Sequence, residues 1–199
     1  MSDGVTETMQ DQPTDPAQEA WFHVMRRLAL LMIERNFAAA LSEVQTFLGG
    51  EVGHEWRAEA LAFRGDIKEE MGDLRGAKLD FSAARSLVGP GYAKYVHEIS
   101  LAGICRKQQL IDEAISWYRA AMHTAIEVDK ISSGSALSGL LKLQSQAELT
   151  TEDREICVRA AKQSWRVLGL PGSPDISGLE KVASLICKAE TKPPRPSAQ

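Results

Sequence analysis

The sequence predicts an all-α protein, and three observations support that prediction. Ala, Leu, Glu and Arg are plentiful while aromatic residues make up 6%, which suits helices packed through small side chains better than β-rich packing. Apolar residues recur at helical spacing along nearly all of residues 17–189, and no convincing alternation of period two appears. A set of four small or apolar positions also recurs at a constant interval, as in helical repeat proteins.

The interval of this repeat is 37 residues. Within each set the spacings are three, four and three, so the four side chains share one face of a helix. The second member is always Ala, and the third is branched or aromatic. The sets are Phe37, Ala40, Val44 and Phe47; Leu74, Ala77, Phe81 and Ala84; and Ile111, Ala114, Tyr118 and Ala121.

A second helix precedes each set and repeats more loosely. Leu30, Ile67 and Ile104 form one column, and Gly65 and Ala102 supply small residues at which helix backbones can approach closely. Turn residues separate the two helices at Arg35-Asn36, Gly72-Asp73 and, more weakly, Gln109. The pattern predicts three antiparallel helix pairs, with helices near 18–34, 38–48, 54–71, 74–87, 92–107 and 111–127.

Helical patterns continue after residue 128 without the Ala–aromatic signature. Ser132 and Ser133 are expected to cap one helix, and Thr150 with Asp153 resembles a capping box ahead of another. A last amphipathic helix is expected to cover the apolar end of the array. The predicted division is a disordered acidic tail (1–16), a helical repeat domain (17–189) and a disordered Pro-rich tail (190–199). Within the domain we expect repeats at 20–50, 54–90 and 92–128, a degenerate repeat at 131–170 and a capping helix at 175–189.

The second unit, Leu61 to Pro90, resembles a tetratricopeptide repeat. That family follows Trp-x2-Leu-Gly-x2-Tyr, then Ala-x3-Phe, a later Ala and a Pro. Leu61, Arg64 and Lys68 replace the Trp, Leu and Tyr, so the first helix is atypical. The third unit keeps a shorter set. The matching residues are Gly65, Gly72, Asp73, Ala77, Phe81, Ala84 and Pro90, then Leu101, Ala102, Ala114, Tyr118 and Ala121.

The resemblance covers residues 20–127. It implies a right-handed superhelix of three to four antiparallel helix pairs, closed by a C-terminal capping helix. Each pair is too small to bury its own apolar faces, so successive pairs are expected to stack and share one core.

The charge distribution argues against a nucleic-acid partner. The net charge is −4, and the five acids of residues 1–20 stand there without Lys or Arg. The remaining 22 acids (27 less five) nearly balance 23 bases, and no basic stripe emerges to contact phosphates. No long apolar run or leader sequence is present, which predicts no membrane insertion. Cys105, Cys157 and Cys187 are too widely spaced for a disulfide framework or zinc knuckle, which favours a reducing, cytoplasmic location.

The chemistry-bearing motifs of enzymes are missing from the sequence. It contains no HExxH, GxxxxGK[ST], GxSxG, GxGxxG or CxxC pattern. His23 and His97 occupy equivalent positions two repeats apart, too far to share a metal with each other. We therefore predict no catalytic residue, no metal site and no cofactor, and the protein is expected not to be an enzyme.

The resemblance implies a concave face, lined by the first helix of each pair, that holds a peptide. The Lys and Asn clamp with which one family subset grips terminal carboxylates is absent from the corresponding positions. The face offers an apolar end and an acidic centre, so the expected partner segment carries hydrophobic anchors followed by Lys or Arg. The candidate partner-binding residues are Phe22, Met25, Glu59, Asp66, Glu69, Glu70, Ile99 and Arg106.

The leading interpretation is a protein–protein interaction scaffold, an adaptor or a dedicated chaperone. Two alternatives stay open: a peptide-sensing regulatory module, and an immunity or escort protein for a toxic or secreted partner. Homodimerisation is a further alternative, because Trp21, Phe22 and Met25 are expected at an uncovered end of the array.

Overall fold

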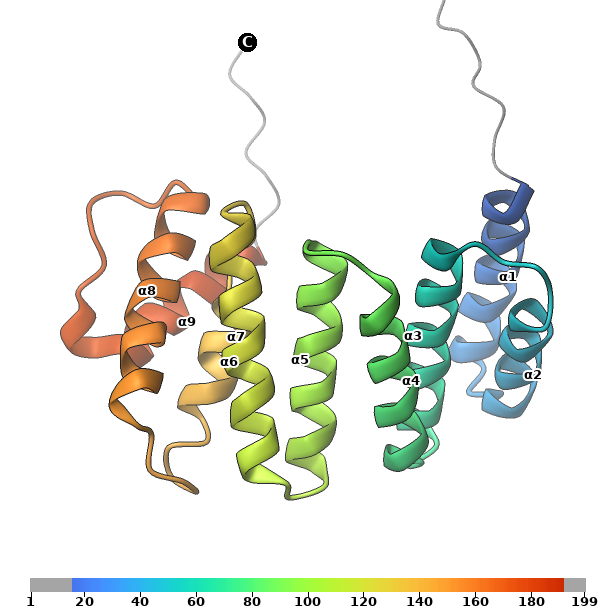
Figure 1. Ribbon diagram of the computed structural model, residues 1–199, viewed down its shortest axis with the longest axis horizontal. Coiled ribbons are helices and arrows are strands. Elements are labelled where there is room, and N and C mark those ends of the chain that lie inside the picture. The colour runs from blue at the N-terminus through green and yellow to red at the C-terminus, as the bar shows by residue number, and fades with distance from the viewer. Residues whose placement is uncertain (1–15, 192–199) are drawn as a thin grey trace, which may run out of the picture.

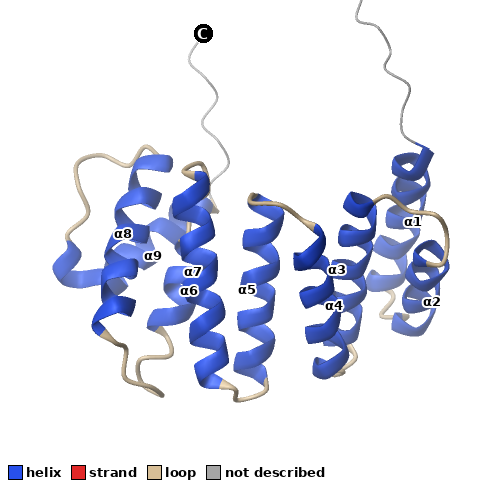
Figure 2. Cartoon of the chain, in the orientation of Figure 1, coloured by secondary structure: helices blue, strands red, loops and turns tan. Residues whose placement is uncertain are grey.

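The computed structural model describes residues 16–191, and these residues form α-helices with one short 3₁₀ turn and no strand (Figures 1 and 2). The all-α class is confirmed. The expected tails lie outside the described residues, except that Pro16 already begins the first helix and Glu190 ends the last. The helices are α1 (Pro16–Ile33), α2 (Phe37–Leu48), α3 (His54–Glu70), α4 (Leu74–Leu87), α5 (Tyr92–Lys107), α6 (Ile111–Val128), α7 (Gly134–Leu141), α8 (Thr151–Val167) and α9 (Leu179–Glu190).

The helices form a row from α1 and α2 at one end to α8 and α9 at the other, in chain order as far as α6 (Figure 1). From α1 to α6 each helix packs against the next one in sequence, and α6 contacts both α7 and α8. The bounds of the first six helices differ from the expected ones by two residues at most. Among the described helices, none is both long and apolar enough to cross a membrane. The right-handed superhelix itself stays a prediction.

The 37-residue interval is visible in the backbone of the turns. Arg35, Gly72 and Gln109 have φ values of 55°, 82° and 62°, so each repeat reverses direction through one left-handed residue. In each turn the following amide donates to the carbonyl five residues earlier, as in a Schellman motif. Asn36 and Asp73 then cap the next helix through their side chains, whereas Leu110 at the same position has no side chain that accepts.

Side-chain contacts between repeats span intervals close to that of the repeat. Trp21 in α1 bonds Glu59 in α3, 38 residues on, and Lys107 in α5 pairs with Glu69, also 38 residues away. On the other helix layer, Lys78 in α4 pairs with Glu113 in α6 at an interval of 35. Corresponding helices of neighbouring pairs are therefore linked directly, in addition to the contacts inside each pair.

Small residues set how closely the helices approach. Ala40, Ala77 and Ala114 are fully buried, so the Ala column predicted from the sequence lies in the core. A Cβ atom on Gly65 would stand 3.1 Å from the Phe81 ring, which packs directly over that glycine. Phe81 also belongs to the buried cluster with Leu101 and Ile104 of α5, and thus joins the second pair to the third.

The helices after α6 continue the row with different packing. Gly139 of α7 lies against the Tyr118 ring of α6, and a Cβ there would be 2.3 Å from it. The capping role expected of the Ser132 and Ser133 side chains is wrong. Ser133 is the N-cap of α7 but its hydroxyl bonds the Ala160 carbonyl and the Ser164 hydroxyl of α8, and the Ser132 hydroxyl is buried without a partner.

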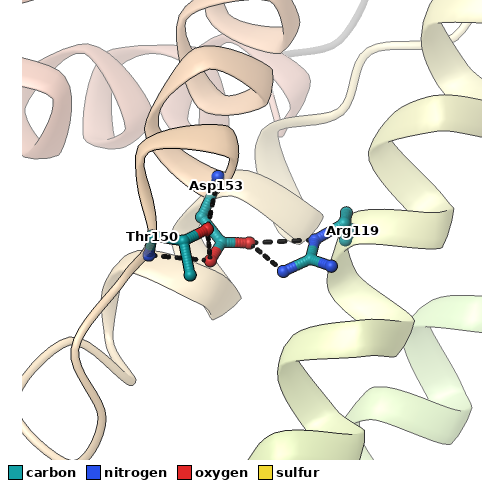
Figure 3. Close-up of polar contacts among 3 residues, drawn as sticks. All are labelled: Arg119, Thr150 and Asp153. Atoms are coloured by element: carbon teal, nitrogen blue, oxygen red, sulfur yellow. Dashed lines mark hydrogen bonds and ion pairs between the residues drawn. The ribbon is translucent and has the colours of Figure 1, made fainter.

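The capping box expected at the start of α8 is present. Thr150 accepts from the Asp153 amide, and Asp153 accepts from both the amide and the hydroxyl of Thr150. The other carboxylate oxygen of Asp153 accepts two hydrogen bonds from the Arg119 guanidinium of α6, at 2.9 and 2.5 Å (Figure 3). Burial alone would raise the pKa of Asp153, but the bonds from Thr150 and Arg119 outweigh it and lower that pKa. The capping box thus also fixes α8 to α6.

The final helix α9 packs against α7 and α8. Val182, Ala183 and Ile186 form its buried face, as the amphipathic pattern predicted. Its last residue, Glu190, accepts a hydrogen bond from the Gly134 amide at the N-terminus of α7. A carboxylate is favourable there because the unpaired amides of a helix N-terminus carry partial positive charge.

Candidate partner-binding surface

The eight candidate residues lie on α1, α3 and α5, the first helices of the three predicted repeats. Phe22 is 52% exposed and packs edge-on against Trp56 of α3, at 6.4 Å between ring centroids. Met25 and Ile99 are half-buried and pack partly into the core. Phe22 is therefore the one large apolar candidate that offers most of its surface.

Trp21 corrects one expectation from the sequence. It was expected at an uncovered end of the array, but it is 2% exposed. Its ring packs against Phe47 and Phe63, and its indole nitrogen donates a 2.7 Å hydrogen bond to Glu59. The exposed apolar residues of α1 are instead Phe22, Leu30 and Ile33.

Two of the four acidic candidates hold helices together. Glu59 accepts the bond from Trp21 of α1, and Glu69 pairs with Lys107 of α5. Glu59 therefore lies where α3 meets α1, and Glu69 lies where α3 meets α5. They leave less of either carboxylate for a partner than the sequence alone implied.

Asp66 and Glu70 have no such partner. Among the described residues neither makes an ion pair or a side-chain hydrogen bond, and both are exposed on α3. Desolvation, followed by repulsion from Glu69 and Glu70, raises the pKa of Asp66 to about 6. Among the four acidic candidates, the charge without an ion-pair partner or hydrogen-bond donor therefore lies at Asp66 and Glu70, and their role as the centre of a binding face stays a prediction.

The strongest buried charges of the chain lie elsewhere and do not face a partner. Asp80 of α4 is buried and accepts from Arg64 and Lys68 of α3. Glu98 of α5 is fully buried between Arg85 of α4 and Thr124 of α6. Sequence reasoning missed these pairs, because a charged residue on a helix reads as a solvated face until its neighbour is known.

A basic pocket lies near the C-terminal end of the helix row, and the sequence analysis did not identify it. An open pocket of about 590 Å³ lies between α7 and α9, with Leu141 and Ala183 in its lining and Lys142 and Lys188 at its edges. A second pocket of about 270 Å³ adjoins it and extends to Arg106 of α5. The two share Ser138, Lys142 and Cys187.

Arg106 is the only candidate that belongs to this basic pocket. Its guanidinium lies beside the Tyr118 hydroxyl; burial raises the pKa of Tyr118, and the cation opposes that rise. The structure thus separates Arg106 from the acidic candidates on α3. The sequence signal that was available is the cluster of Lys and hydroxyl residues at 135–142 and 184–191, which only the fold brings together.

The histidines do not form a metal site. His23 and His123 are exposed on α1 and α6, whereas His97 is buried in α5, its Nδ1 atom without a hydrogen-bond partner. Burial lowers the pKa of His97 and favours its neutral form. Within residues 16–191, no three His, Cys, Asp or Glu side chains gather closely enough to hold a metal ion.

No protein-family model matches the chain, and no curated protein matches its sequence. Among solved structures, the crystal structure of BtubC (BKLC) from P. vanneervenii is similar, with a TM-score of 0.58. The two chains are 12% identical, over 92% of this chain and 94% of that one. A likeness at this identity shows a shared all-helical fold and carries no function across. Membership of the tetratricopeptide family stays a prediction.

Proposed function

We propose that the protein is a binding scaffold, an adaptor or a dedicated chaperone, that holds a segment of another protein against α1, α3 and α5. The partner segment carries a hydrophobic residue for the exposed Phe22 and Lys or Arg for the acids of α3. The three cysteines are unpaired, and two of them are buried, which favours a reducing location such as the cytoplasm.

The uncompensated charge at Asp66 and Glu70 is the observation that carries this proposal. Carboxylates that lie side by side without a cation repel each other; desolvation, and after it this repulsion, raises the pKa of Asp66. A cation from a partner would relieve it. Repulsion of this kind inside the stable core would only cost folding free energy, so its place on an exposed face of α3 favours a binding role.

The experiment compares three forms of the full-length protein, tagged and purified from its native cell. These are the native chain, Asp66→Lys with Glu70→Lys, and the control Glu127→Lys on the exposed side of α6. The proposal expects a stoichiometric partner with the native chain and the control, and its loss from the double variant. Equal recovery from all three would move the binding surface elsewhere, and no partner at all would contradict the function.

A further inference from the structure

The basic pocket between α7 and α9 has properties that the acidic face does not explain. Three cations line its two chambers: Arg106 from α5, Lys142 from the C-cap that follows α7, and Lys188 from α9. They come from three segments far apart in the sequence, so their meeting is a product of the fold. Figure 1 shows α7 and α9 together at one end of the row, next to α6 and α8.

None of these three cations makes an ion pair among the described residues. The nearby carboxylates accept hydrogen bonds from neutral groups and form no ion pair with these cations. Glu190 accepts from the Gly134 amide, and Glu180, which lines the larger pocket, accepts from the Gln144 side chain. By contrast, Arg64, Lys68, Arg85 and Arg119 all bind buried acids. The pocket is therefore lined by three cations that have no ion-pair partner among the described residues.

The lining between the cations is suited to a peptide. Leu141 and Ala183 provide apolar surface, and the Ser138 and Ser184 hydroxyls provide hydrogen-bond donors. Pockets with an apolar lining and a few convergent polar groups are the usual form of binding sites. A ligand that matches this one brings carboxylates for the cations and an aliphatic side chain for the lining.

We propose that this pocket binds an acidic segment of a partner protein, one in which Asp or Glu residues flank an aliphatic residue. The inference deepens the proposed function and rests on it, since both require a partner protein. The acidic residues of α3 and the cations of the pocket then recognise opposite charges, and together they orient the bound segment along the row of helices.

The test uses two short labelled peptides and the full-length protein, with binding followed by fluorescence anisotropy. One peptide is built of Glu and Leu, and its control carries Gln in place of each Glu. We expect the Glu peptide to bind at least about tenfold more tightly than the Gln peptide, and its affinity to fall as salt is raised. Lys142→Glu with Lys188→Glu should remove that preference, whereas Lys162→Glu on α8 should keep it.

A third peptide, built of Lys and Leu, reports separately on the α3 face. It should lose affinity with Asp66→Lys and Glu70→Lys, and not with Lys142→Glu and Lys188→Glu. If only the Lys peptide binds, the pocket proposal is wrong and the proposed function stands. If neither charged peptide binds in preference to the Gln peptide, both are wrong.

The chain itself supplies one competing occupant, because residues 1–15 hold four acids and no base. A synthetic peptide of residues 1–15 has Asp3 and Glu7 on either side of Val5, so we expect it to displace the Glu peptide, but more weakly than unlabelled Glu peptide does. Displacement as strong as that by unlabelled Glu peptide would assign the pocket to this chain's own N-terminal segment and overturn the assignment to a partner. Melting curves of each variant confirm that the exposed substitutions leave the fold intact.

Discussion

Glu98 of α5 and Arg85 of α4 form an ion pair across the junction of the second and third helix pairs. The Glu98 carboxylate is fully buried and accepts from Nε and Nη2 of Arg85 at 2.9 and 2.7 Å, while its other oxygen accepts from Thr124 of α6 at 2.8 Å. The Arg85 guanidinium also lies 5.2 Å from the centre of the Trp117 ring. One carboxylate therefore fixes three helices relative to one another.

This arrangement makes the two partners unequal. Arg85→Met should cost about 3–5 kcal/mol of unfolding free energy, because it leaves a buried carboxylate without its cation. Glu98→Gln should cost less, because the amide oxygen can still accept from Arg85, its NH2 group can donate to the Thr124 hydroxyl, and Arg85 is partly exposed to water. Urea unfolding of both single variants and the double variant measures the difference. If the two single variants lose the same unfolding free energy, the burial of Glu98 does not make the two partners unequal.

Two substitutions in the turn between α5 and α6 should stabilise the protein. It places Gln109 in the left-handed conformation that Gly72 adopts one repeat earlier, and Leu110 where Asp73 caps the helix. A side chain at that φ costs about 1 kcal/mol, and a missing N-cap costs about 1 kcal/mol. Gln109→Gly with Leu110→Asp should therefore raise the unfolding free energy by roughly 1–2 kcal/mol, as measured by thermal or urea unfolding. The reverse exchange, Gly72→Gln with Asp73→Leu, is the matched control and should lower it by a similar amount.

Two glycines should respond to alanine in opposite ways. In Gly139→Ala the ideal position of the new methyl group is 2.3 Å from the buried Tyr118 ring. This clash should cost roughly 1–3 kcal/mol of unfolding free energy. Gly103→Ala in α5 meets no atom within 4 Å, so it should gain about 0.5–1 kcal/mol from helix propensity. Thermal unfolding distinguishes them, and a neutral Gly139→Ala would contradict the close contact of α6 with α7.

Asp66 should make stability depend on pH in the direction opposite to a salt-bridged acid. Its pKa is raised from 3.8 to about 6 in the folded protein, so folding favours the neutral form. The stabilisation that the neutral Asp66 carboxyl contributes is therefore fully present below pH 3.8 and is lost as the pH rises through about 6. Because the side chain is exposed and screened by water, Asp66→Asn should gain only about 0.5–1 kcal/mol at pH 7. That gain should disappear below about pH 4 in paired urea titrations; a gain that is constant with pH would have another cause.

The helices were predictable because their signals are local. Each signal depends on residues within one or two turns of the chain. The examples are the helical spacing around Ala40, Ala77 and Ala114, the turns at Arg35 and Gly72, and the Thr150–Asp153 capping box. Ser133 was misassigned because its hydroxyl has a nearby alternative in α8, which no local pattern records. The same holds for Trp21, whose burial depends on α2 and α3 folding over it.

The candidate site was predictable only in part, for a related reason. Helical spacing placed Asp66 and Glu70 on one exposed face, since the three-to-four-residue period is enough for that. It did not show that Glu59 and Glu69 serve as links between helices, because their partners lie 38 residues away. The basic pocket needs Arg106, Lys142 and Lys188 from three segments far apart in the sequence, and only the tertiary fold brings them together.

The two ends of the helix row are not equivalent in their surroundings. The outer side of α1 exposes Leu30 and Ile33, at 62% and 79%, whereas α7 lies among α6, α8 and α9 and is held by Glu190 at its first turn. In a linear array each helix is stabilised mainly by its immediate neighbours. Loss of structure should therefore begin at α1 and α2 and proceed along the chain, so that amide hydrogens near the N-terminal end exchange with solvent while the C-terminal helices are still folded.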